Sequence, residues 1–136
     1  MKKQIVAGLM IISALASFGC GGRNTEFGVV DMKVVESKAE IVKSTREDVM
    51  AKGKALQEEM NTKLEGLSDE EKAKTIDDYR GQMNVINSEA QNKLKASLDA
   101  ALREVAKEKN LGAVLVKEAV PQGGVDVTDA VVEKMK

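Results

Sequence analysis

Apolar residues recur at every seventh position through the segment from residue 33 to residue 66, and the positions between them are mostly charged or polar. A repeat of this length places the apolar side chains in one narrow stripe along a helix, with the opposite face in water. The pattern therefore predicts a helix over residues 33–66 with a narrow apolar seam. The seam positions are Val35, Ala39, Val42, Val49, Leu56, Met60 and Leu67.

A second segment, residues 69–109, has apolar positions spaced by three and four, which is typical of a coiled-coil face. These positions are Ile76, Tyr79, Met83, Ile86, Ala90, Leu94, Leu98, Ala101 and Val105. Two such helices joined by a tight turn can bury their seams against each other only by folding back antiparallel. The two segments together predict a long helical hairpin.

The residues between the two helices carry the expected signals for a turn. Gly66 can adopt the left-handed conformation that follows a helix, and Ser68 with Glu71 matches the capping box that starts one. A single continuous helix through Gly66 is the alternative, because an isolated glycine costs a helix only about 1 kcal/mol. We favour the hairpin.

Short apolar runs flank the hairpin on both sides. Residues 27–32 read as a strand buried on both faces, residues 111–117 as a second strand, and residues 119–127 as a hairpin-like segment that turns at the Pro-Gln-Gly-Gly sequence. Thr128 can cap a last helix over residues 128–135, whose apolar positions would face inward. The fold class expected is α+β, predominantly α, with a coiled-coil arm inserted in a small β body.

A β body this small needs a further source of stability. It has no disulfide or metal to stabilise it, and domains of this size rarely fold alone without one. We therefore expect the protein to oligomerise through the apolar strand residues. The candidate oligomerisation residues are Val29, Val30, Val114 and Val116.

The N-terminus indicates export. Lys2 and Lys3 precede an uncharged apolar run that is too short to span a membrane and has the length of a signal peptide core. Residues 14–16, Ala-Leu-Ala, fit ordinary signal peptidase, whereas residues 17–20, Ser-Phe-Gly-Cys, fit a lipoprotein signal. We favour a lipoprotein signal peptide over residues 1–19, lipidation of Cys20 and a tether over residues 20–26, because Cys20 is the only cysteine and has no disulfide partner.

Composition argues against several functional classes. The chain has no histidine and no tryptophan, so most metal sites and all histidine-based catalytic pairs are excluded. Without Lys2 and Lys3 the chain has fewer basic residues than its 22 acidic ones, and aromatic residues make up 2% of it. Nucleic-acid binding is therefore not expected, because it requires a basic face. We expect no enzyme, no cofactor and no catalytic or metal-binding residue.

Four sequence blocks carry a family resemblance. They are residues 27–32 (Phe-Gly-Val-Val-Asp-Met), 105–116 (Val-Ala-Lys-Glu-Lys-Asn-Leu-Gly-Ala-Val-Leu-Val), 119–120 (Ala-Val) and 124–129 (Gly-Val-Asp-Val-Thr-Asp). In their order around a charged hairpin, they resemble the Skp/OmpH family of periplasmic chaperones, and the resemblance covers residues 27–136. It implies a homotrimer whose β body holds three helical arms around a cavity for unfolded outer-membrane proteins. The arms are somewhat shorter and more acidic than is usual for the family.

Two functions remain from the sequence. The first is an ATP-independent holdase in the periplasm, anchored by lipid to the outer membrane, that binds unfolded outer-membrane or envelope proteins. Met50, Met60 and Met83 are its candidate client contacts, because methionine adapts to varied apolar partners, although ordinary seam packing explains each of them as well. The second is a structural coiled-coil lipoprotein that acts as a spacer or tether in the envelope.

Overall fold

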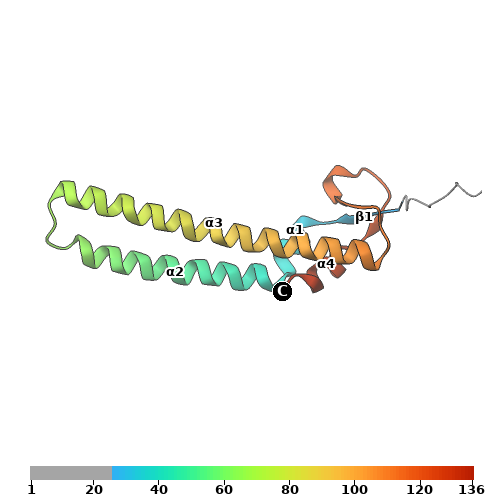
Figure 1. Ribbon diagram of the computed structural model, residues 1–136, viewed down its shortest axis with the longest axis horizontal. Helices are drawn as coiled ribbons and strands as arrows, with labels where there is room; N and C mark the ends of the chain where they lie inside the picture. The colour runs from blue at the N-terminus through green and yellow to red at the C-terminus, as the bar shows by residue number, and fades with distance from the viewer. Residues whose placement is uncertain (1–25) are drawn as a thin grey trace, which may run out of the picture.

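The computed structural model describes residues 26–136 and is an elongated, predominantly helical α+β structure (Figure 1). A long helical hairpin extends from a small body that contains a three-stranded sheet. The elements, in chain order, are β1 (Phe27–Val30), α1 (Met32–Lys38), α2 (Glu40–Leu64), α3 (Asp69–Glu108), β2 (Ala113–Val116), a 3₁₀ helix η1 (Lys117–Ala119), β3 (Val125–Asp126) and α4 (Thr128–Lys134). The predicted signal peptide, Cys20 and most of the tether lie outside the described residues.

The predicted turn between the two long helices is confirmed. Gly66 has a φ of 81°, in the left-handed region, directly after α2 ends. The Glu71 carboxylate accepts hydrogen bonds from the Ser68 backbone N–H at 3.0 Å and from the Ser68 hydroxyl at 2.6 Å. These bonds lower the pKa of Glu71, the hydroxyl more than the backbone. Helices α2 and α3 therefore run antiparallel and pack along their length, and the continuous helix is excluded (Figure 1).

The first predicted helix is not continuous. It is broken at Ala39, whose ψ of 127° is extended and whose side chain is fully buried. The break redirects the chain, so that α1 packs against α4 whereas α2 packs against α3. Val35 and Val42, one heptad apart in the predicted seam, are thus both buried but contribute from two different helices. Neither glycine nor proline marks the break, which explains why periodicity missed it.

The sheet is parallel throughout, in the order β2-β1-β3. Val29 lies opposite Leu115 on one side and Asp126 on the other. The predicted hairpin over residues 119–127 is therefore wrong, because Ala119 ends the 3₁₀ helix η1 and β3 pairs with β1. The chain reaches that position through Gly124, where φ is 88° and a side chain would come within 2.7 Å of the Phe27 ring. Strand β1 is thus the central strand, with both of its edges paired.

The core lies where the body meets the base of the hairpin. Its fully buried large side chains are Val30, Val35, Val105, Val127 and Val131. They come from β1, α1, α3 and the segment around α4, so the body and the base of the arm share one core. On its surface, Lys134 of α4 contacts Glu104 at 2.5 Å and Glu108 at 2.6 Å on α3, and both carboxylates raise the pKa of Lys134.

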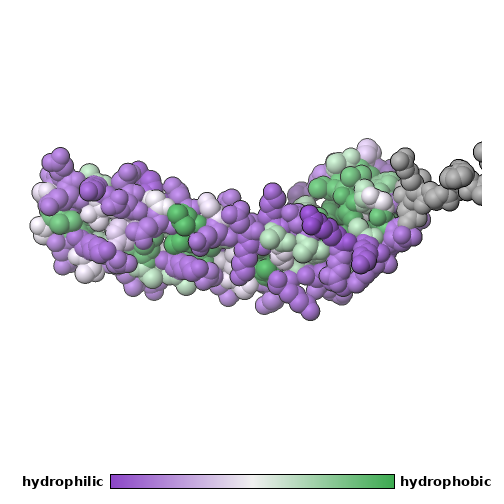
Figure 2. All heavy atoms as spheres, in the orientation of Figure 1, coloured by the Kyte–Doolittle hydropathy of each residue, from purple (hydrophilic) through white to green (hydrophobic). Residues whose placement is uncertain are grey.

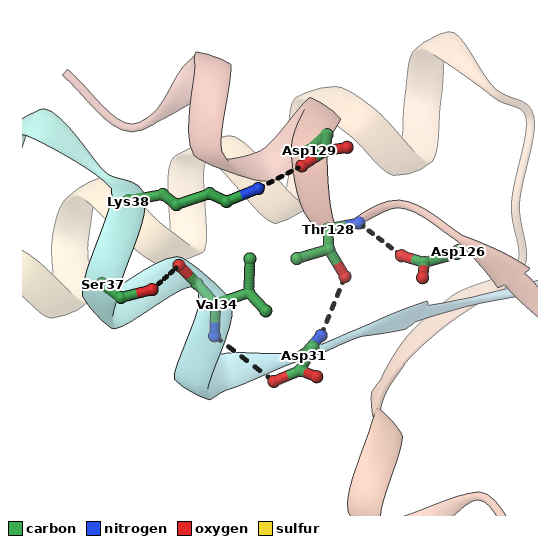
Figure 3. A network of polar contacts seen from close by, with 7 residues as sticks. All are labelled: Asp31, Val34, Ser37, Lys38, Asp126, Thr128 and Asp129. Atoms are coloured by element: carbon green, nitrogen blue, oxygen red, sulfur yellow. Dashed lines mark hydrogen bonds and ion pairs between the residues drawn. The ribbon is translucent and has the colours of Figure 1, made fainter.

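A polar network joins the strand before the arm to the helix after it (Figure 3). The Asp31 backbone N–H donates to the Thr128 hydroxyl at 3.0 Å, and the Thr128 backbone N–H donates to the Asp126 carboxylate at 2.9 Å. The Thr128 hydroxyl, and then its N–H, lower the pKa of Asp126. Asp31 in turn caps α1 by accepting from the Val34 N–H at 3.3 Å. Strand β1 consequently ends at Val30, two residues earlier than predicted.

The predicted cap at Thr128 is also corrected. Thr128 is the first residue of α4 and its hydroxyl accepts from Asp31, which is 97 positions away in the sequence. Thr128 is buried, so this hydroxyl links two distant segments and does not simply start a helix.

Replacing Thr128 with valine should therefore destabilise the protein. The substitution preserves shape but leaves the part-buried Asp31 N–H without its acceptor, which should lower the free energy of unfolding by about 1 kcal/mol. Urea unfolding followed by circular dichroism measures the change. Thr45→Val is the matched control, because the Thr45 hydroxyl is buried without a hydrogen-bond partner and its loss should be neutral or stabilising. Equal effects of the two substitutions would contradict this role of Thr128.

Candidate binding surfaces

The two outer strands of the sheet expose apolar side chains. Val116 on β2 is 42% exposed, and Leu115 on β2 and Val125 on β3 are exposed to a similar extent. β2 and β3 are also the edges of the sheet among the described strands. Figure 2 shows apolar residues gathered at the body end of the molecule, whereas mostly hydrophilic residues cover the hairpin. Exposed apolar strands at sheet edges are surfaces that pair readily with another chain.

The four predicted oligomerisation residues do not share one environment. Val30 is only 2% exposed and Val29 is also buried, so both already belong to the core of a single chain. Val114 is half-buried against that core, and Val116 alone of the four is exposed. The sequence reasoning missed Leu115 and Val125 as exposed positions. Their apolar character was visible, but their exposure depends on which strands flank them.

The three predicted client-binding methionines also separate. Met50 on α2 is 69% exposed and points away from the seam. Met60 and Met83 are half-buried, and the Met83 methyl group lies 3.3 Å from where a side-chain carbon on Gly53 would be. Met83 therefore packs between the helices, as ordinary seam residues do. Met50 is the methionine of the three that can contact another molecule without rearrangement.

Two further apolar residues on α3 are exposed. Val85 is 57% exposed, and Ile76, which the spacing assigned to the seam, is also exposed at its margin. An apolar residue off the helical stripe is the signal that could have identified Val85. With Met50, these residues form the exposed apolar positions of the arm.

Several charges on the arm surface pair within one helix. Lys52 contacts Asp48 at 2.8 Å, which raises the pKa of Lys52, and Arg80 contacts Asp77 at 3.2 Å. Exposed pairs of this kind contribute little to stability. Their effect is to keep the arm hydrated and locally neutral around the exposed apolar positions.

One aromatic residue, Tyr79, is buried near the tip of the arm. Tyr79 on α3 is 6% exposed, and the Lys63 ammonium of α2 lies 5.5 Å from the centre of its ring. Glu59 contacts Lys63 at 2.7 Å, which raises the pKa of Lys63 and lowers that of Glu59. We call Glu59, Lys63 and Tyr79 the distal lock. Spacing predicted Tyr79 in the seam, but gave no sign of its two partners.

The described part of the chain offers little for metal or ligand chemistry. Within residues 26–136, no group of three or more His, Cys, Asp or Glu side chains could hold a metal ion. A shallow groove beside the polar network is lined by three lysines and three aspartates, so its charges balance: Lys38, Lys109, Lys117, Asp31, Asp126 and Asp129. None of the helices described is both long and apolar enough for a membrane crossing.

Comparison with known proteins adds no family assignment. No protein-family model matches the sequence, and the search of curated proteins found no match. The resemblance to the Skp/OmpH chaperones therefore stays a prediction from the quoted sequence blocks.

We expect the sheet edges to form the interface between copies of the chain. Val116→Lys should then convert the assembly to single chains, because a lysine would be buried at the interface without a partner. Light scattering measures the mass, and thermal unfolding verifies that each chain still folds. Val85→Lys is the matched control, since Val85 is exposed on the arm and its replacement should leave the mass unchanged. An unmutated protein with the mass of one chain would refute the interface.

Proposed function

We propose that this protein is an ATP-independent holdase chaperone of the periplasm that binds unfolded outer-membrane or other envelope proteins. The observation that carries the proposal is the set of exposed apolar side chains, Met50, Ile76 and Val85, on an otherwise charged and hydrated arm. An unfolded chain presents scattered apolar groups, and several separate apolar contacts made at once suit such a partner better than one deep pocket.

The strength of the contacts is consistent with holding and release without ATP. Fully burying one large apolar side chain contributes about 1.5–3 kcal/mol, so a partial contact at Met50 or Val85 contributes less. A single contact cannot hold a client, but several made at once by linked arms can. A client that folds buries its own apolar groups and removes the contacts one at a time. Release would then follow from client folding.

Assembly is part of the proposal. We infer a homotrimer joined through the exposed sheet edges, which places several arms near one client. The small body, whose core draws on the base of the arm, supports self-association, as do the exposed Leu115, Val116 and Val125. The number of copies in the assembly, three, is taken from the family resemblance. A structural spacer built from the same rod is the competing function, and it requires no client contact.

Shortening the arm separates the two functions. The contact between Gly53 and Met83 gives the register of the hairpin, so deletion of residues 50–63 and 73–86 removes two matched heptads from each helix. The body and the base of the arm are retained. We expect the shortened protein to assemble normally but to lose its ability to suppress aggregation of a denatured β-barrel protein, measured by light scattering at near-stoichiometric amounts.

A full-length variant with lysine at positions 50, 76 and 85 is the companion test. It retains the length of the rod and removes the exposed apolar contacts, so a chaperone should lose most of its protection whereas a spacer should be unaffected. If the shortened protein protects the client as well as the full-length protein does, the holdase proposal is refuted and the spacer is favoured.

We further propose that the chain is tethered to the outer membrane by lipid on Cys20, which lies outside the described residues. Cys20→Ser removes the only thiol that could be lipidated. The substituted protein should move from the membrane fraction to the soluble periplasmic fraction on cell fractionation. Ser17→Ala, in the same segment but not the acceptor, is the control and should remain with the membrane. Unchanged membrane association of the Cys20 variant would refute the anchor.

A further inference from the structure

Each long helix contains one glycine, and the two glycines lie at nearly the same level of the arm. Gly53 of α2 faces Met83 of α3, whose methyl carbon and sulfur lie 3.3 and 3.6 Å from the position of a side-chain carbon on Gly53. Gly81 is two residues before Met83, which is about 3 Å along the helix axis. Both antiparallel helices are therefore weakened within the same turn.

No local packing or backbone conformation requires a glycine at position 81. It lies inside α3 with ordinary helical backbone, and nothing lies within 4 Å of where its side chain would be. Glycine in a helix interior costs about 1 kcal/mol relative to alanine, because it gains more freedom when the helix opens. At position 53 an alanine would meet only the flexible end of Met83. Both sites could hold a stronger helix former.

The seam around the two glycines is only half-buried. Toward the body, the last buried residue of α2 is Thr45, and toward the tip, the first buried residue of α3 is Tyr79. Between these levels the seam residues, such as Val49, Leu56 and Ile86, are only half-buried. Few buried contacts and weak helix formers together mark a segment that opens at low free energy.

We propose that the arm has a hinge at Gly53 and Gly81, about which its distal part bends on its proximal part. On the distal side of the glycines Tyr79 is buried with the Lys63 ammonium beside its ring, and on the proximal side the shared core fixes the base of the arm to the body. Bending there moves the exposed Ile76 relative to Met50 without breaking the shared core. The hinge does not depend on the chaperone proposal.

Distance measurements between spin labels test the hinge in the full chain carrying Cys20→Ser, so that introduced cysteines are the only thiols. One pair, Lys43→Cys with Asn61→Cys, spans Gly53 within α2. The control pair, Glu89→Cys with Lys107→Cys, has the same separation in the proximal part of α3, about 27 Å in a straight helix. All four positions are exposed. Labelled chains are diluted with unlabelled chains to exclude distances between copies.

We expect a broader distance distribution for the first pair than for the second. Gly53→Ala with Gly81→Ala should narrow the first distribution to the width of the control, and amide exchange at residues 80–85 should slow by about fivefold for Gly81→Ala alone. Gln82→Ala, at the exposed neighbouring position, should change neither the distance distribution nor the rate of amide exchange. If the double variant folds poorly, the distance distribution is measured with Gly81→Ala alone, because an alanine at this position meets only open space. A narrower distribution then supports the hinge. Equal widths for the two pairs, or a width that the alanines leave unchanged, would overturn the hinge.

Discussion

The structure depends on the parallel pairing of β1, which precedes the arm, with β2 and β3, which follow it. Strands from the far side of the hairpin pair with both edges of β1, and its apolar Val30 is buried in one cluster with Val105 and Val131. This pairing brings the two ends of the hairpin together and positions α4 over its base. The bond from Asp31 to Thr128 then joins the same two segments on the polar side.

The arm was predictable because its features depend on interactions between residues close together in the sequence. A seven-residue repeat, a left-handed glycine and a capping box are each determined by neighbours within a few positions, and all three are found in the structure. The break at Ala39 and the position of β3 are different. Ala39 leaves the helix because α1 and α2 pack on different partners, and β3 pairs with β1 because that strand has an uncovered edge. Packing and pairing between segments far apart in the chain cannot be inferred from a short stretch of sequence.

The candidate surfaces show the same limit. Spacing assigned Met83 to the seam and left Met50 outside it, and the structure agrees, but Ile76, also assigned to the seam, is exposed. Which face of a helix is covered depends on the partner helix and its register. Likewise, Val30 and Val116 belong to apolar runs of similar character, but the central strand is buried and the edge strand is not. Residue type identified where apolar chemistry lies, and only the assembled fold shows which part of it is available.

The separation of Asp31 and Thr128 by 97 positions also has a consequence for the order of folding. During synthesis β1 is made first, and its partners appear only after the whole hairpin. The hairpin can form outward from its turn at Gly66 through short-range contacts. The core at its base can form only after Val127 and Val131 have been synthesised. Closing that long loop is entropically more costly than forming the hairpin. During synthesis, β1 is therefore made long before the strands that pair with it.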